Sequence, residues 1–225
     1  MQLCTYTRTS KPQDAIAAAN KNGRFIAGGT TLYDLMKLDV ERPETLVDIN
    51  ELPLDKIERT SSGGLRIGAM VKNATVAEHS EVKRRYPVLS EALLAGASGQ
   101  IRNMASSAGN LLQRTRCVYF RDVDMPCNKR EPGSGCSAIE GHHRNLAILG
   151  VSDKCIASNP SDQNVALMAI GATIHIQGPK GTRTVPIADF YKLPGNTPHI
   201  ETVLQKGELV THIELPPLPT GANSL

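Results

Sequence analysis

The sequence contains no tryptophan, and aromatic residues make up only 4% of its 225 residues. Proteins that bind single-stranded nucleic acid usually stack bases on aromatic side chains, so this composition disfavours that class. An excess of one charge is also lacking, because 25 Lys and Arg oppose 22 Asp and Glu, for a net charge of +3. A nucleic-acid-binding domain is expected to carry a larger basic surplus. We therefore expect no nucleic-acid partner.

Long apolar runs are absent as well. No stretch approaches the roughly 18 consecutive apolar residues needed to cross a bilayer, so we expect no membrane insertion. The first twenty residues, MQLCTYTRTSKPQDAIAAAN, lack the basic start and apolar centre of an export signal. Apolar residues nevertheless make up 40% of the chain, enough for a hydrophobic core. Its 19 Gly and 14 Pro predict many tight turns and an α+β or α/β chain.

Five cysteines are present, and four of them fall between residues 117 and 155. An odd number without an export signal argues against a disulfide framework. Cys117, Cys127, Cys136 and Cys155 are separated by nine, eight and eighteen residues. Zinc fingers and ribbons usually pair cysteines two to four residues apart. Four thiolates on a long, polar, Gly- and Pro-rich loop favour an iron–sulfur cluster instead.

Two other interpretations of these cysteines stay open. The four thiols could be unrelated core residues, since free cysteine is often buried. They could also bind a single zinc ion. His142 and His143 lie in the same loop and could replace one cysteine as a ligand, although adjacent histidines in loops are usually solvated.

Hydrophobic periodicity predicts the main elements. We expect a helix at 10–19 with Ser10 as its cap, then a strand, turn, helix and strand within 24–49. A strand at 64–71 and two helices at 75–86 and 88–97, separated by Pro87, should follow. A helix at 161–172 capped by Ser161, a hairpin over 173–187 with GPKG as its turn, and a final strand, GELVTHIELP, complete the prediction.

The turn Ala27-Gly28-Gly29-Thr30-Thr31 joins a predicted strand to a predicted helix. Two adjacent glycines let the backbone approach an anion closely, and the N–H groups at the helix start favour negative charge. The turn matches neither G-x-G-x-x-G nor the P-loop pattern, so a plain tight turn remains an alternative.

Two further segments have the same character. Ala105-Ser106-Ser107-Ala108-Gly109-Asn110 is rich in small residues that leave backbone donors exposed. Ser161-Asp162 opens a predicted helix, where a carboxylate either caps the helix or accepts hydrogen bonds from ribose hydroxyls. The sequence contains no nucleophilic residue and basic residue at a spacing known from catalytic motifs. We therefore expect no catalytic side chain.

Taken together, FIAGGTTLYDLM, IRNMASSAGNLL and NPSDQNVALMAIGA resemble the FAD-binding subunit of the xanthine dehydrogenase (molybdenum hydroxylase) family, and GELVTHIELP resembles its closing strand. The resemblance covers about residues 25–215. In relatives the Gly-Asn and Ser-Asp elements are separated by only a few residues, whereas here the four-cysteine segment lies between them. Such an insertion, holding a [4Fe–4S] cluster, is similar to that of the flavin subunit of bacterial periplasmic aldehyde oxidoreductases.

The resemblance implies a role for each matching residue. The FAD contacts it implies are Ile26, Ala27, Gly28, Gly29, Thr30, Thr31, Leu32 and Tyr33, then Ala105, Ser106, Gly109 and Asn110, then Ser161 and Asp162, and finally Leu209 and Val210 against the isoalloxazine. Cys117, Cys127, Cys136 and Cys155 would hold the cluster, and Cys4 lies outside it. Gln113 stands where relatives often have a small hydroxyl residue, which weakens that contact.

The resemblance also implies a fold. It is an α+β, two-lobed FAD-binding fold of the PCMH (vanillyl-alcohol oxidase-like) type, with the [4Fe–4S]-bearing loop inserted and the C-terminal domain of the family missing. We expect a first FAD-binding subdomain (βαβ) at 1–55 and a second at 56–215 with the insertion at about 113–158. Residues 216–225, PPLPTGANSL, would form a linker.

The implied function is electron transfer within a molybdenum hydroxylase complex that oxidises aldehydes to carboxylic acids. FAD on this chain would receive electrons from iron–sulfur centres and pass them to an external acceptor. The expected assembly is a heterotrimer with a [2Fe–2S] subunit and a molybdenum cofactor subunit, located in the periplasm by co-export with a signal-bearing partner, or else in the cytoplasm. Three alternatives remain: a 4-hydroxybenzoyl-CoA reductase-like flavin subunit, a non-catalytic zinc-stabilised scaffold subunit, and a free-standing flavin oxidase.

Overall fold

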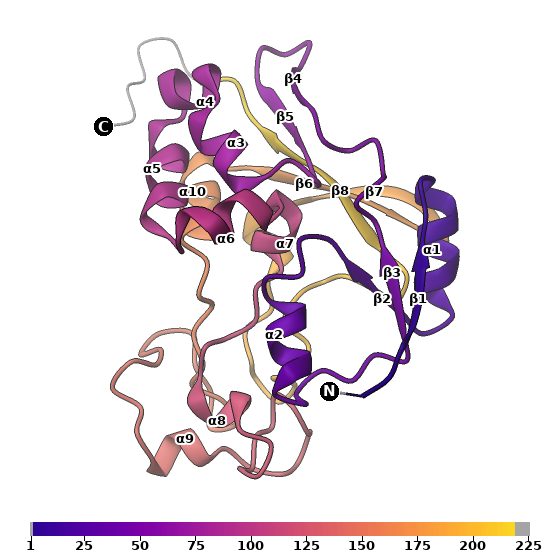
Figure 1. Ribbon diagram of the computed structural model, residues 1–225. Helices are drawn as coiled ribbons and strands as arrows, with labels where there is room; N and C mark the ends of the chain where they lie inside the picture. The colour runs from indigo at the N-terminus through magenta and orange to yellow at the C-terminus, as the bar shows by residue number, and fades with distance from the viewer. Residues whose placement is uncertain (1, 219–225) are drawn as a thin grey trace.

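A computed structural model describes residues 2–218 and shows two β-sheets flanked by short helices (Figure 1). The strands are β1 (Thr5–Arg8), β2 (Gly23–Ile26), β3 (Thr45–Asp48), β4 (Ile57–Arg59), β5 (Leu65–Gly68), β6 (Thr173–Gly178), β7 (Gly181–Pro186) and β8 (Leu209–Leu215). The helices are α1 (Pro12–Asn20), α2 (Leu32–Lys37), α3 (Asn73–Glu78), α4 (Ser80–Arg85), α5 (Pro87–Ala95), α6 (Gly99–Met104), α7 (Ser107–Leu111), α8 (Val118–Arg121), α9 (Ser137–Glu140), α10 (Asp162–Ile170) and α11 (Ile187–Phe190). No helix in this part of the chain is long and apolar enough to cross a membrane.

The first sheet is parallel, with strand order β1-β3-β2, and α1 packs on β2 and β3. The predicted strand, turn, helix and strand at 24–49 correspond to β2, α2 and β3. Strand β1 was not predicted from the sequence. Its sequence, TYTR, lacks the alternation of apolar and polar residues that marks a half-buried strand, and all four residues are exposed in the structure.

The second sheet is antiparallel, with strand order β4-β5-β8-β6-β7. The predicted hairpin forms β6 and β7, with Gly178 opposite Gly181 across the turn. Strand β8, the last in the described part of the chain, inserts between β5 and β6 and occupies the centre of the sheet. Leu209 and Val210, at the start of β8, are both buried, Leu209 in the cluster with Val47 and Ile49 of the first-sheet region and Val210 in the main core.

Helices α3, α4, α5 and α10 gather on one side of the second sheet, at the upper left of Figure 1. Their buried side chains form the main core with those of the sheet, including Leu65, Ile67, Ile174, Ile176, Ile213, Tyr86, Leu89 and Leu167. The expected helix at 75–86 is instead two helices, because His79 takes an extended conformation (φ −65°, ψ 126°) between α3 and α4. Pro87 opens α5, as its fixed φ allows.

Two predicted caps have different outcomes. Ser161 caps α10, because its hydroxyl accepts a hydrogen bond from Asn164 N, and Gly171 ends that helix in the left-handed region (φ +75°). Ser10 does not cap α1. The helix begins at Pro12, and its cap position is occupied by Lys11, one residue after the expected cap.

The four-cysteine segment lies apart from both sheets, at the bottom of Figure 1. It is largely irregular, as expected, with α8 and α9 each amounting to four residues. A small core of its own contains Cys117, Phe120, Cys127 and Ala138, and Leu35 of α2 completes it. The segment is therefore anchored to the helix that follows the Gly-Gly turn.

The division into subdomains at 1–55 and 56–215 stays a prediction. Each sheet lies within one of the two ranges. However, Val47 and Ile49 share a core cluster with Ala69, Met70 and Leu209, so the two sheets are packed together. Most of the expected linker, 219–225, lies outside the described residues.

Candidate functional site

A cleft of about 730 Å³ runs between the first sheet, α7 and the segment that leads into β8. Its volume falls within the roughly 300–1,000 Å³ typical of small-molecule sites. The predicted FAD contacts that line it are Ile26, Ala27, Gly28, Gly29, Thr30, Thr31, Leu32, Ser106, Gly109, Leu209 and Val210. The tertiary structure thus brings three distant segments of the predicted site to one cleft.

The Gly-Gly turn forms one wall of the cleft, and its two glycines serve different purposes. Gly29 has φ +71°, a backbone conformation that residues other than glycine rarely adopt. A Cβ on Gly28 would lie 1.9 Å from the carbonyl oxygen of Met104, so this glycine permits close packing against the end of α6. Within residues 2–218, the N–H groups of 28–31 have no hydrogen-bond acceptor. They are available to an anionic ligand.

The second wall comes from α7. Ser106 is buried and caps this helix by accepting a hydrogen bond from Gly109 N at 3.2 Å. A Cβ on Gly109 would lie only 2.9 Å from that same hydroxyl oxygen. Small residues are therefore needed here for local packing as well as for any approach of a ligand.

Five predicted FAD contacts do not line the cleft: Tyr33, Ala105, Asn110, Ser161 and Asp162. Tyr33 lies under the ammonium group of Lys37, with Nζ 4.7 Å from the ring centroid. The hydroxyl of Ser161 donates a hydrogen bond to Asn110 Oδ1 at 2.7 Å, behind the cleft wall. Direct contact of these five residues with a cofactor stays a prediction.

Several residues that line the cleft were not predicted from the sequence. They include Arg24, Glu41, Arg114, Tyr191, Glu201 and Gln205. Tyr191 donates a hydrogen bond from its hydroxyl to Leu111 O at 2.8 Å, and burial raises the pKa of that hydroxyl. Gln113 also lines the cleft and donates to Asn110 Oδ1. Arg24 lies on β2 and the others lie outside the helices and strands, and no local sequence motif marks any of them.

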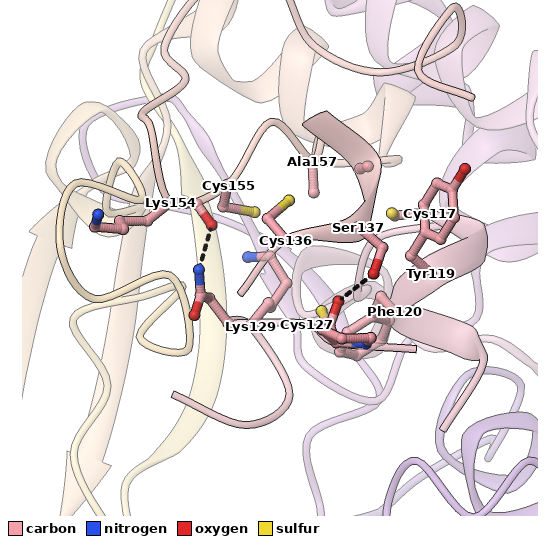
Figure 2. Close-up of a pocket in the computed structure, with 13 residues that line it drawn as sticks. Cys117, Tyr119, Phe120, Cys127, Lys129, Cys136, Ser137, Lys154, Cys155 and Ala157 are labelled. Atoms are coloured by element: carbon pink, nitrogen blue, oxygen red, sulfur yellow. Dashed lines mark hydrogen bonds between the residues drawn. The ribbon is translucent and has the colours of Figure 1, made fainter. Parts of the chain in front are cut away.

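A second, smaller cavity is lined by all four clustered cysteines (Figure 2). The sulfur atoms of Cys117, Cys136 and Cys155 point toward the space between them in this view. Cys127 joins Cys136 through an isolated antiparallel bridge between their backbones. Cys4 lies outside this cavity. The long loop thus folds so that four thiols spread over residues 117–155 line a common space.

Burial in this cavity favours the neutral form of two of its thiols, Cys117 and Cys155. Burial raises the pKa of Cys117, and the neighbouring Cys127 and Cys136 raise it further. Burial also raises the pKa of Cys155, while the nearby Lys129 opposes that shift. A positive charge beside a cysteine set offsets part of the repulsion between thiolates.

The structure does not arrange these cysteines as ligands of a single metal ion. Among residues 2–218, no three or more His, Cys, Asp or Glu side chains form such a group. His142 and His143 are exposed and do not line the cavity. The cavity itself has about 10 Å³, room for about one water molecule. The donor set of four thiols suits an iron–sulfur cluster, but the cavity would have to widen to hold one.

Comparison with known proteins agrees with the expectation that the glycine-lined cleft binds FAD. Residues 2–218 match the family model described as the FAD binding domain in molybdopterin dehydrogenase. The aldehyde oxidoreductase FAD-binding subunit PaoB of Escherichia coli K12 is 55% identical over 228 residues, covering 100% of this chain and 71% of that protein. The glyceraldehyde dehydrogenase medium chain of Sulfolobus acidocaldarius is 29% identical over 216 residues, covering 95% of this chain and 60% of that protein.

A solved structure shares the fold. The CO dehydrogenase from Oligotropha carboxidovorans contains a chain that matches with a TM-score of 0.70 and 24% identity, over 98% of this chain and 61% of the other. This chain therefore spans between about 60% and 71% of the length of these three proteins. The whole-length match of the family model and the high identity to PaoB lead to one conclusion: this chain belongs to the family of FAD-binding domains of molybdopterin dehydrogenases.

Proposed function

We propose that this chain is the FAD-containing electron-transfer subunit of a molybdenum hydroxylase complex that oxidises aldehydes to carboxylic acids. The observation that carries the proposal is the 730 Å³ cleft in a chain of an FAD-binding family, walled by a glycine turn whose N–H groups have no hydrogen-bond acceptor among residues 2–218. The names of two relatives, an aldehyde oxidoreductase subunit and a glyceraldehyde dehydrogenase chain, support aldehydes as the substrate class.

The residues of the cleft suit two parts of FAD, its central pyrophosphate and its isoalloxazine ring. The N–H groups of 28–31 would donate to the pyrophosphate, with the hydroxyls of Thr30 and Thr31 beside them. Leu209 and Val210, at the start of β8, would pack against the isoalloxazine. Bound flavin supplies the redox chemistry, since it exchanges electrons singly or in pairs. The protein supplies position, burial and hydrogen bonds, and no acid or base from this chain is required.

We further propose that Cys117, Cys127, Cys136 and Cys155 hold a [4Fe–4S] cluster. The support is their common cavity, the four-thiol donor set and the largely irregular segment that carries them. Ligand binding would stabilise this segment, because binding energy of a metal group adds to folding energy. The proposal requires that the sulfur atoms move apart when the cluster is assembled.

The assembly and the compartment are also proposals. We propose a heterotrimer with a [2Fe–2S] subunit and a molybdenum cofactor subunit, which would supply electrons to the flavin. We propose that the complex reaches the periplasm by co-export with a signal-bearing partner. Co-purification of partner subunits with a tagged form of this chain would test the assembly, and fractionation of cells would test the compartment.

Flavin and metal analysis of protein purified under anaerobic conditions tests the function. We expect about one FAD and about four iron atoms per chain, and no turnover of aldehydes by the isolated chain. Protein without flavin that contains zinc would instead indicate the scaffold subunit. Aldehyde oxidation without partner subunits would indicate a free-standing oxidase. Flavin without iron would leave the cleft assignment intact and reject the cluster.

A further inference from the structure

The cleft and the cysteine cavity share a wall. Leu35 of α2 lines the cleft and packs in the same core as Cys117 and Cys127. Phe120 lines the cavity, and the guanidinium of Arg114 lies 4.7 Å from the centre of its ring. Arg114 itself lines the cleft. The two sites are thus separated by one layer of side chains.

A carboxylate joins the two sides of this layer. Glu201 Oε2 lies 2.5 Å from Arg114 Nε, an ion pair without hydrogen-bond geometry. Glu201 Oε1 accepts a hydrogen bond from Lys129 Nζ at 2.9 Å. Lys129 lines the cysteine cavity, where Figure 2 shows it beside Cys155 and Cys136. We call this arrangement, Arg114–Glu201–Lys129, the Glu201 bridge.

The Glu201 bridge is shielded from water. The exposed fractions of the side chains are 18% for Arg114, 27% for Glu201 and 10% for Lys129. Arg114 also pairs with Glu41, so its charge stays balanced without Glu201. Among the described residues, Lys129 would retain only the carbonyl oxygen of Pro198, at 3.0 Å, and a buried cation left without its carboxylate is strongly unfavourable. Loss of Glu201 would therefore release the cysteine segment more than the cleft wall.

The bridge connects parts of the chain that are far apart in sequence. Lys129 belongs to the cysteine segment, whereas Glu201 belongs to the segment that walls the cleft before β8. A second tie, from Ser152 Oγ to Gly195 O at 2.9 Å, joins the same two segments but is exposed. A ligand that orders the cleft wall would consequently order the cysteine segment through Glu201.

We propose that Glu201 is a positioning residue that couples FAD binding in the cleft to ordering of the cysteine segment, residues 117–157. This inference rests on the proposed function, because it takes FAD as the ligand of the cleft. By thermodynamic linkage the coupling is reciprocal, so an ordered cysteine segment strengthens FAD binding by the same factor.

Hydrogen exchange measured by mass spectrometry tests the coupling on the purified chain, with FAD removed and then restored. In the wild-type chain we expect FAD to slow exchange about tenfold both in peptides covering 26–32 and in peptides covering 117–157. In Glu201→Gln, at an FAD concentration that saturates the variant by absorbance, only the 26–32 peptides should be slowed. If the role of Glu201 were purely structural, Glu201→Gln would speed exchange equally with and without FAD. The ratio of the exchange rates without and with FAD would then stay as in the wild-type chain.

Two more variants complete the test. Glu81→Gln is the matched control, since Glu81, like Glu201, pairs with more than one cation (Arg59, Arg84 and Arg85) and its side chain is 19% exposed, but it lies on α4. It should behave as wild type. Lys129→Gln breaks the Glu201 bridge without changing the residues that line the cleft. If Glu201→Gln does not fold, the same exchange measurement on Lys129→Gln tests the coupling. Retained slowing of 117–157 in the folded bridge variants overturns the coupling while FAD binding stands. A wild-type chain that does not bind FAD overturns the coupling and the proposed function together.

Discussion

The hydroxyl of Ser161 donates a hydrogen bond to the side-chain oxygen of Asn110 at 2.7 Å, and both residues are buried. The two residues are separated by the entire cysteine segment. Their contact closes that segment at its base and fixes α7 against the start of α10. Two segments that resemble separate cofactor contacts in the sequence are thus joined to each other in the structure.

Ser161→Ala should lower the free energy of unfolding by about 1–2 kcal/mol, because it removes both the cap of α10 and the bond to Asn110. Denaturant unfolding measures the change. Ser98→Ala is the control, since the hydroxyl of Ser98 caps α6 at an exposed position without a buried side-chain partner. Equal losses in the two variants would show that the bond to Asn110 contributes nothing.

Gly29→Val should weaken FAD binding about tenfold or more, because a β-branched residue cannot hold φ +71° and the turn would shift. Titration of FAD-free protein, followed by fluorescence, gives the dissociation constant. Gly63→Val provides the same backbone strain, at φ +87°, in the turn between β4 and β5 with open space around it. That variant should lose stability and keep its FAD affinity. Unchanged FAD affinity in Gly29→Val would remove the turn from the site.

Cys127→Ser and Cys136→Ser should each reduce iron from about four atoms per chain to less than about one, because a cluster that lacks a thiolate is lost during purification. Iron analysis and visible absorbance measure this loss. Cys4→Ser is the control, since Cys4 lies outside the cavity, and it should keep its iron. If both cavity variants retain full iron, the four-ligand assignment is wrong.

His212, on β8, should make folding sensitive to mild acid. Burial lowers the pKa of His212, and the nearby Arg66 and His175 lower it further. Below about pH 6.5 the unfolded chain therefore takes up a proton before the folded chain does, and the free energy of unfolding should fall as the pH falls. His212→Asn should flatten this dependence, whereas His143→Asn, at an exposed position, should not. Chemical denaturation between pH 5 and 8 compares the three proteins.

Much of the local structure could be predicted from the sequence. The Gly-Gly turn, the cap at Ser161 and the hairpin of β6 and β7 are each encoded within a few consecutive residues, by backbone freedom, a hydroxyl at a helix start and turn glycines. Strand β1 and the break at His79 could not be predicted, because neither changes the apolar pattern of the chain.

The candidate site was predictable only in part, for the same reason. Its glycine turn and clustered cysteines are visible as short patterns. Arg114, Tyr191 and Glu201 lie in irregular segments and acquire meaning only through the residues they face. The sequence also could not show that Asn110 and Ser161 face each other behind the wall of the cleft.

By itself, the sequence determined that this protein has a glycine turn after a strand, four cysteines on one polar loop, and the family to which these patterns belong. Only the tertiary structure decided that β8 enters the middle of the second sheet, that the four thiols face one cavity, and that Glu201 joins this cavity to the cleft. Local conformation depends on neighbours a few residues away, whereas contacts between distant segments depend on which surfaces become buried together when the whole chain folds.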